Sequence, residues 1–266
     1  MLRLSDGDWR AEIRPEFGMN VSSLQWQNTP ILRAPRDTEA LTNDPFLHGV
    51  PLLLPANRTK NGQFSFGNRI YTLPLNEPLR HNHIHGLMFD APFAVTEQTD
   101  NTLRAVYQNR GERYPFAFDM TITDVLQEGW HRTVELHALE DMPYTMAFHI
   151  TFVAPTKFSV PIGRRFVWDE NFIPTGETAE AEPFGQAISG YYKAIGHTAR
   201  FDDFSFTVSD NFDQWVLFNG GGNKGFLCIE PQCGGVNGLN TTEHRVLEAG
   251  QREIFTLEIR QNLLQS

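Results

Sequence analysis

The sequence predicts an all-β protein, a large antiparallel β-sandwich with very little helix. Apolar and polar residues alternate with a period of two along the whole chain, as in strands that turn one face to a core and the other to solvent. Turn-forming pairs separate these segments. We find no amphipathic pattern of about 11 residues or more that would indicate a long helix.

The clearest alternating segment is FAFDMTIT at residues 116–123, where every second residue is Phe, Met or Ile. The same period recurs at residues 133–138, 204–208 and 255–259. The turn signals that separate such segments are Asp6-Gly7, Asn61-Gly62, Gly67-Asn68, Glu128-Gly129 and Ala249-Gly250. Asn61-Gly62 predicts a hairpin, because a type I′ turn needs a positive φ at both central residues.

The composition fits one large core. The chain has 266 residues, of which 40% are hydrophobic and 20% charged, and this balance excludes a disordered chain. No linker, repeat or shift of composition divides the sequence, and β-sandwiches of this length are often single domains. We therefore expect one domain over residues 1–266.

The charge balance argues against certain classes of binding partner. Lys and Arg number 22 against 32 Asp and Glu, a formal net charge of −10 without any basic run, which argues against nucleic acid and anionic membranes. The first residues, MLRLSDGDWRAEIRPE, lack the apolar centre of a signal peptide, and no stretch approaches the roughly 20 apolar residues of a membrane span. These features predict a cytoplasmic protein with a small-molecule partner, and they leave monomer and homodimer open.

Two motifs with known chemistry are weak here. Cys228 and Cys233 are too few for a disulfide framework, and no second pair completes a zinc site, so we expect two reduced, buried thiols. The run NGGGN at residues 219–223 lacks the Lys-Ser/Thr of a phosphate loop and is typical of a turn between strands.

Polar residues interrupt two apolar segments of the first half. Asn57 and Arg58 end the run HGVPLLLPANR, and a buried arginine must satisfy its donors on a carboxylate or on ligand hydroxyls. In RHNHIHG, residues 80–86, His81, His83 and His85 stand at alternate positions and would share one face of a strand. Such a row suits a metal cluster, the wall of a ligand cleft, or merely an exposed edge.

Two further ionisable residues lie in apolar strands of the second half. His149 lies within PYTMAFHITF, where a lone histidine is either a core residue or a functional group. Glu230 follows the apolar run FLCI and precedes Pro231, and a carboxylate there is costly unless it is hydrogen-bonded or protonated. Together with Arg58 and His85, these residues suit acid–base chemistry on a polyhydroxylated substrate, with no cofactor motif and no metal site expected.

The same motifs resemble the aldose 1-epimerase, or galactose mutarotase-like, family over most of the chain. The matching segments, in order, are Pro51–Arg58 with Asn61-Gly62-Gln63-Phe64, His83-Ile84-His85-Gly86, His149, Asp203, Cys228-Ile229-Glu230-Pro231-Gln232 and Leu247-Glu248-Ala249-Gly250-Gln251. The resemblance implies a many-stranded antiparallel β-sandwich with an open cleft, and reversible interconversion of the α and β anomers of an aldohexose.

The resemblance also implies roles for individual residues. Glu230 would be the base, His149 the acid and His85 a second histidine of the cleft, whereas Arg58, Asn57, His83 and Asp203 would bind the sugar. Three other interpretations remain open. A hexose-6-phosphate 1-epimerase would need extra arginines, for which Arg164 and Arg165 are the candidates; a sugar-binding module would have lost turnover; and a cupin-type enzyme would bind a metal through the histidines of residues 81–85 and His149.

Overall fold

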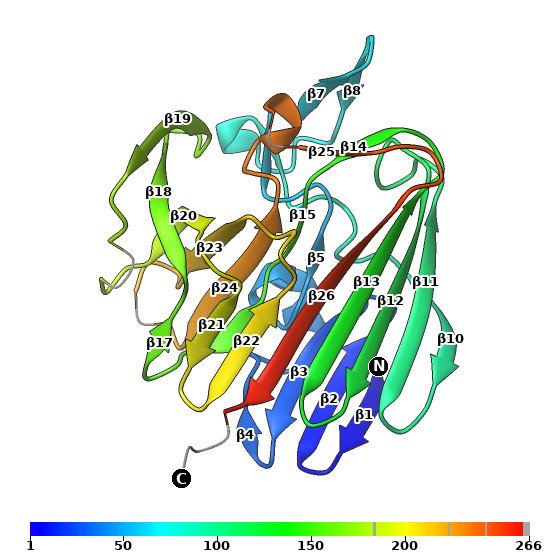
Figure 1. Ribbon diagram of the computed structural model, residues 1–266, viewed down its shortest axis with the longest axis vertical. Coiled ribbons are helices and arrows are strands. Elements are labelled where there is room, and N and C mark those ends of the chain that lie inside the picture. The colour runs from blue at the N-terminus through cyan, green and yellow to red at the C-terminus, as the bar shows by residue number, and fades with distance from the viewer. Residues whose placement is uncertain (183–184, 223, 243, 263–266) are drawn as a thin grey trace.

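Antiparallel sheets make up almost all of the protein in its computed structural model (Figure 1). The structure describes residues 1–182, 185–222, 224–242 and 244–262. Three sheets form the body of the molecule, two of eight strands and one of four, and three two-stranded ladders extend them. All pairings between named strands are antiparallel, as the sequence predicts.

The four-stranded sheet is formed by the N-terminal segment and has the order β1-β2-β3-β4. It packs against the eight-stranded sheet that contains Phe204, where Trp9 and Trp26 each make an edge contact with the ring of Phe204. Its strands are β1 (Leu2–Asp6), β2 (Trp9–Arg14), β3 (Asn20–Trp26) and β4 (Thr29–Pro30).

The first eight-stranded sheet has the order β10-β11-β12-β13-β26-β22-β21-β17, so the last long strand of the chain lies at its centre. This sheet contains the segments whose alternation is clearest, and one face of β12 is buried at every second residue from Phe118 to Leu126, as expected. Its strands are β10 (Ala94–Gln98), β11 (Thr102–Asn109), β12 (Phe118–Leu126), β13 (Trp130–Ala138), β17 (Phe158–Ser159), β21 (Thr198–Phe201), β22 (Phe204–Val208) and β26 (Arg252–Gln261).

The second eight-stranded sheet carries the candidate site. Its order is β19-β18-β20-β23-β24-β15-β5, and β16 also pairs with β24. The segment of residues 143–152, expected as one strand, is divided among three ladders, with His149 and Ile150 at the break between β15 and β16. The strands are β5 (Leu52–Leu53), β15 (Met146–Phe148), β16 (Thr151–Val153), β18 (Ile162–Trp168), β19 (Pro174–Ala179), β20 (Ser189–Ala194), β23 (Gln214–Phe218) and β24 (Phe226–Cys233).

Short ladders and helical turns complete the fold. The ladders pair β6 (Arg58–Lys60) with β9 (Asn82–Ile84), β7 (Gln63–Phe66) with β8 (Arg69–Thr72), and β14 (Met142–Tyr144) with β25 (Arg245–Leu247). The helical elements are α1 (Thr38–Asn43), η1 (Pro45–Leu47), η2 (Pro78–Arg80) and η3 (Gly238–Asn240). Within the described residues, no helix has the length and apolar character to cross a lipid bilayer.

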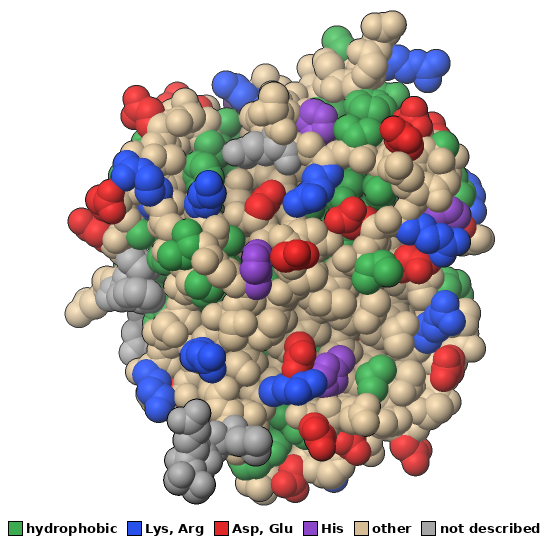
Figure 2. Space-filling view, in the orientation of Figure 1, with side chains coloured by type: hydrophobic (Ala, Val, Ile, Leu, Met, Phe, Trp, Pro, Cys, Tyr) green, Lys and Arg blue, Asp and Glu red, His purple; other side chains and the backbone are tan. Residues whose placement is uncertain are grey.

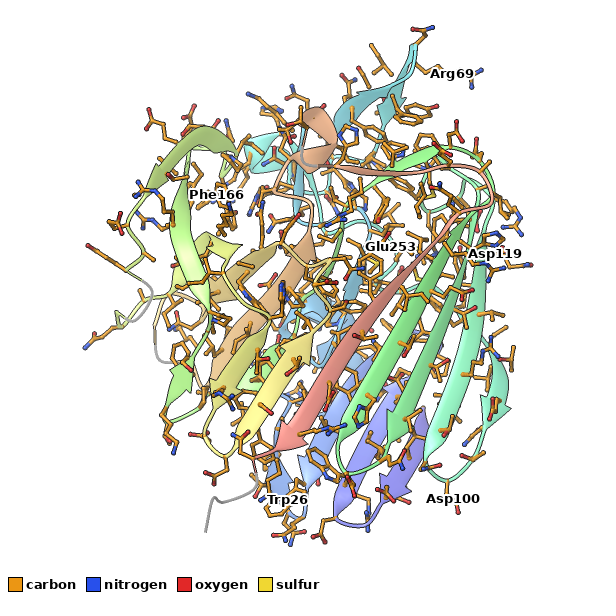
Figure 3. The ribbon with its side chains drawn as sticks, in the orientation of Figure 1. Trp26, Arg69, Asp100, Asp119, Phe166 and Glu253 are labelled. Atoms are coloured by element: carbon orange, nitrogen blue, oxygen red, sulfur yellow. The ribbon has the colours of Figure 1, made fainter. Side chains whose placement is uncertain are left out.

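The Asn61-Gly62 turn differs from the prediction. Both residues have positive φ, 57° and 60°, but the strands on either side pair with other partners, so the turn joins two ladders and does not close a hairpin. Gly62 instead packs against the backbone of Leu73, where a Cβ would lie 2.5 Å from the carbonyl oxygen. The hairpin forms one turn later, at Gly67-Asn68, and its tip at Arg69 projects from the body (Figure 3).

One cluster of buried hydrophobic side chains extends from Leu4 to Ile259 and joins the sheets. An ion pair lies inside it: Asp124 accepts bonds from Arg132 Nε (2.9 Å), Arg132 Nη2 (2.8 Å) and Trp130 Nε1 (2.8 Å). The side chains of Asp124 and Arg132 are both 0% exposed. The alternating pattern thus predicted the face of β12 correctly, but not that a carboxylate would occupy a core position.

Candidate active site

A cleft of about 280 Å³ lies over one face of the second eight-stranded sheet, which suits a small ligand. Residues paired across strands line it: Tyr191 on β20 opposes Val216 on β23, and Val216 opposes Glu230 on β24. The lining residues are Asn57, Arg58, Arg80, Ile84, His85, His149, Phe172, Ser189, Tyr191, Val216, Leu217, Phe218 and Glu230. Larger hollows of about 550, 610 and 650 Å³ contain neither Glu230 nor His149.

Glu230 reaches the cleft from a strand that is buried along its whole length. Its neighbours on β24, Ile229 and Pro231, point to the opposite face because side chains alternate along a strand. Glu230 is only 2% exposed, and its Oε2 has no hydrogen-bond partner among the described residues. A buried carboxyl with a free oxygen at the floor of a cleft is available for a ligand or for proton transfer.

His149 lies beside Glu230 because the chain leaves the ladder between β15 and β16. Its backbone N–H donates to Pro51 O (2.9 Å), and the ring is directed to β24. His149 Nε2 lies 3.4 Å from Glu230 Oε1, and His149 Nδ1 has no partner among the described residues. The structure thus places the side chains of the predicted base and the predicted acid side by side.

Burial sets the protonation of this pair. Desolvation raises the pKa of Glu230 well above 4.5, although the positive charge of Arg58 opposes the shift. Desolvation likewise lowers the pKa of His149 from 6.5 to about 4. Both shifts favour the uncharged forms of the two groups, the protonated carboxyl and the neutral imidazole. Buried ionisable groups whose pKa values are shifted in this way are characteristic of catalytic sites.

His85 enters the cleft through a left-handed backbone conformation, with φ of 67°. Its N–H donates to Asn57 O (2.8 Å), and its ring lies 5.2 Å from that of His149 between centroids. The next residue, Gly86, also has positive φ (64°), and a Cβ there would lie 2.1 Å from Leu54 O. Only glycine allows the backbone to approach Leu54 this closely, and this contact holds the neighbouring His85 in position. Desolvation, with the charge of Arg58 nearby, lowers the pKa of His85 well below 6.5.

Arg58 is held by protein groups. Its Nε and Nη2 donate to the two oxygens of Glu77 (2.9 and 2.8 Å), and its Nη1 donates to Tyr191 Oη (2.7 Å) and Asn57 Oδ1 (3.4 Å). Because a guanidinium has five N–H donors, one remains for a ligand. Desolvation opposes ionisation of Glu77, but the bonds from Arg58 and Asn82 outweigh it and lower its pKa.

One wall of the cleft, formed by aromatic residues, was not predicted from the sequence. The ring of Phe172 lies beneath the guanidinium groups of Arg58 and Arg80, at 5.0 and 4.4 Å. Tyr191 packs against Trp168 with ring centroids 5.2 Å apart. Phe166, labelled in Figure 3, and Trp168 pack against a small hydrophobic cluster that contains Tyr191. Glu77, an acidic residue between Pro74 and Pro78, is a sequence feature that could have indicated this wall.

Two residues predicted to bind sugar lie elsewhere. His83 is 0% exposed and its Nδ1 lies 2.7 Å from Pro74 O, so it stabilises the loop behind β9. Asp203 is exposed in the turn between β21 and β22, in the other eight-stranded sheet. Neither residue lines the cleft, because a motif match fixes the position in the chain but not the face or sheet to which it belongs.

The histidines of residues 81–85 do not share one face. Ladder β9 spans only three residues, and the left-handed conformations of His81 and His85 turn them away from His83. Within the part of the chain that the structure describes, one group of three or more possible metal ligands occurs, formed by His149, Cys228 and Glu230. This differs from the set that a cupin-type site would use. Both cysteines are free and buried, as predicted.

The arginines expected of a phosphosugar site lie away from the cleft. Arg164 on β18 donates to Thr178 and pairs with Glu180, and neither Arg164 nor Arg165 lines the cleft. Of the run at residues 219–223, Gly220 to Gly222 lie in a turn after β23, and Asn223 is outside the described residues. On the face shown in Figure 2, cationic and anionic side chains are interspersed and form no single-sign patch.

Comparison with known proteins decides the family. The model of the family described as aldose 1-epimerase matches residues 1–188, most of the chain. The chain belongs to the aldose 1-epimerase family. The matched segment includes Arg58, His85 and His149 but ends before Glu230. The placement of Glu230 beside His149 therefore comes from the structure and not from the family match.

Solved structures agree on the fold of this aldose 1-epimerase family member. A galactose mutarotase-like protein from Clostridium acetobutylicum has a TM-score of 0.87 at 23% identity, with 98% of this chain and 95% of that chain covered. A galactose 1-epimerase from Lactobacillus acidophilus NCFM has a TM-score of 0.79 at 16% identity (97% and 93% covered). A GalM/aldose epimerase homologue from C. elegans has a TM-score of 0.79 at 15% identity (98% and 99% covered). The galactose mutarotase-like β-sandwich predicted from sequence is therefore confirmed.

Proposed function

We propose that the protein is an aldose 1-epimerase that interconverts the α and β anomers of an aldohexose, with Glu230 and His149 as its proton-transfer pair. The observation that carries this proposal is the 3.4 Å separation of His149 Nε2 and Glu230 Oε1 at the floor of the cleft. The two oxygens of a hemiacetal are bonded to the same carbon, so the groups that exchange protons with them must lie side by side.

The pair holds the single proton that the reaction needs. It reaches the carboxylate–imidazolium form when the proton moves from Glu230 to His149. The Glu230 carboxylate then takes the proton of the C1 hydroxyl while His149 protonates the ring oxygen, the C1–O5 bond breaks, and an aldehyde forms. Rotation about C1–C2 presents the other face, and both proton transfers reverse as the ring closes. No redox step is involved, and each positioned group contributes about 10²–10⁴-fold.

The remaining groups position the sugar. His85 lies beside His149, where its ring can hydrogen-bond near the ring oxygen, and Arg58 keeps one N–H for a hydroxyl. Tyr191 and Phe172 provide the wall against which the apolar face of a pyranose would pack. The bidentate pair of Arg58 and Glu77 stabilises the cleft, because it joins the first residue of β6 to the residue before η2.

Polarimetry on freshly dissolved sugars tests the proposal. We expect catalytic amounts of the purified protein to accelerate the mutarotation of α-D-glucose or α-D-galactose in proportion to enzyme concentration, after subtraction of the spontaneous rate. The panel should include glucose 6-phosphate, because the cleft-lining arginines share Glu77 and we expect no preference for the phosphate. Sugar binding without acceleration of any aldose would indicate a binding module and contradict the proposal.

A further inference from the structure

Cys228 has no part in the proposed reaction, yet its thiol lies beside the proton-transfer pair. It is two residues before Glu230 on β24, so both side chains are on the cleft face of the sheet. Ser189 and Phe218, which line the cleft, lie in the same cross-strand row as Cys228. The thiol is 0% exposed and lies 3.5 Å from Thr151 Oγ1.

We propose that His149, Cys228 and Glu230 form a binding site for a thiophilic divalent cation, Zn²⁺ above all, and that the bound cation inhibits the enzyme. One donor atom from each residue lies within 4.8 Å of the others, and the His149–Glu230 separation is 3.4 Å. In a tetrahedral zinc site, neighbouring nitrogen, oxygen and sulfur ligands are roughly 3.4–3.6 Å apart. Side-chain rotations that move the donor atoms by about 1 Å would therefore bring all three within bonding distance of one ion.

The donor atoms favour this cation over others. Thiolate, imidazole and carboxylate are the ligands of zinc sites, whereas Mg²⁺ and Ca²⁺ select oxygen atoms alone. A cation between His149 Nε2 and Glu230 Oε1 would replace the contact of these two atoms with each other, while Glu230 Oε2 and His149 Nδ1 have no partner among the described residues. The cleft, which both residues line, gives access and supplies a water molecule as fourth ligand.

Inhibition, which rests on the proposed function, follows from the occupied ligands. A cation bound to Glu230 and His149 occupies the lone pairs on which these two groups carry the transferred protons. Thiolate and carboxylate together neutralise its charge, and Arg58 is already paired with Glu77. Binding itself requires no catalysis, so it can be measured separately.

Cobalt and zinc titrations of the full chain test the site. Co²⁺ should bind with one equivalent and give the thiolate-to-cobalt charge-transfer absorption that only a cysteine ligand produces. Zn²⁺ should displace it, and should inhibit mutarotation until a chelator restores the rate. In Cys228→Ala we expect no charge-transfer band, and affinity for Zn²⁺ at least about 10-fold weaker by competition with a chromophoric chelator.

Cys233 offers a matched control on the same strand. It is buried to the same extent, but lies five residues from Cys228 and therefore on the other face of β24. Cys233→Ala should keep the band and the affinity. Absence of the band in the wild-type protein, or loss of it in Cys233→Ala but not in Cys228→Ala, overturns the site. The band with no mutarotation of any sugar would instead refute the proposed function and leave the site intact.

Discussion

His149 Nε2 lies 3.4 Å from Glu230 Oε1, although the two residues come from distant parts of the chain. β24 provides the carboxyl group, and the break between β15 and β16 provides the imidazole. Both groups are at the floor of one cleft and nearly excluded from solvent. This relationship is what an enzyme that moves protons between the two oxygens of a hemiacetal requires.

The pH dependence of mutarotation should report the burial of this pair. Because the pKa of His149 is lowered to about 4 and that of Glu230 is raised, the form with one proton extends from about pH 4 up to the raised pKa of Glu230. Below that window His149 takes a second proton and no base remains, and above it the carboxyl group loses the proton that serves as the acid. Measurement of kcat/KM from pH 3.5 upward, corrected for the spontaneous rate, should give an acid limb near pH 4. An acid limb near 6.5 would show that the imidazole is not desolvated.

Glu77→Gln should weaken substrate binding more than turnover. The substitution removes the charge that holds Arg58 in the cleft, and hydrogen bonds to charged groups contribute about 1.5–3 kcal/mol. We expect KM to rise about 10-fold or more, with kcat changed less than about 3-fold. Glu180→Gln is the matched control, because it breaks an Arg–Glu pair that is exposed and outside the cleft. Equal effects of both variants would exclude a positioning role of Glu77.

Gly86→Ala should disable the cleft through its backbone. A Cβ at this position would lie 2.1 Å from Leu54 O, so the loop must move and carry His85 with it. Gly67→Ala provides the comparison, since Gly67 has a similar φ of 58° but nothing within 4 Å of its Cβ. In both variants an alanine must adopt a left-handed conformation, which should lower the free energy of unfolding by about 1–2 kcal/mol. Only Gly86→Ala should also reduce mutarotation, by more than about 10-fold, and retention of activity would contradict the role of this contact.

The ion pair in the core gives a test of the fold. Asp124→Ala leaves the guanidinium of Arg132 buried and unpaired, which should lower the free energy of unfolding by about 3–5 kcal/mol. Asp119, on the same strand but facing outward (Figure 3), pairs with Arg110 in a partly exposed bridge. Asp119→Ala should cost less than about 1 kcal/mol. Urea denaturation of both variants measures the difference, and similar midpoints would contradict the burial of Asp124.

The sequence was sufficient to predict the fold, and it singled out Glu230 and His149, whose side chains the structure places side by side. Alternation in β12 predicts a strand with one buried face. Glu230, directly after the apolar run FLCI, is a carboxyl group whose burial on β24 needs a functional or structural explanation. The pattern failed where the backbone leaves the strand. Left-handed conformations at His81 and His85 separate histidines that a period of two would align with His83.

Packing between residues distant in the chain also limited what could be predicted from the sequence. Nothing local distinguishes Tyr191 from Tyr192, yet the register of β20 with β23 directs Tyr191 to Arg58 and the cleft. Likewise, Asp203 matched a motif by its place in the chain, but the sheet that contains it does not form the cleft. Such assignments depend on which strands become neighbours, and that is a property of the whole fold.

The proton-transfer role of Glu230 is most directly tested with Glu230→Gln in a polarimetric assay. The amide cannot take the proton of the C1 hydroxyl, and it keeps nearly the same size in a site that is 2% exposed. We expect mutarotation at least about 10²-fold slower, with sugar binding retained by calorimetry. Glu248→Gln, in an exposed turn, should have the wild-type rate. A Glu230→Gln enzyme that turns over at a near-normal rate would contradict the account.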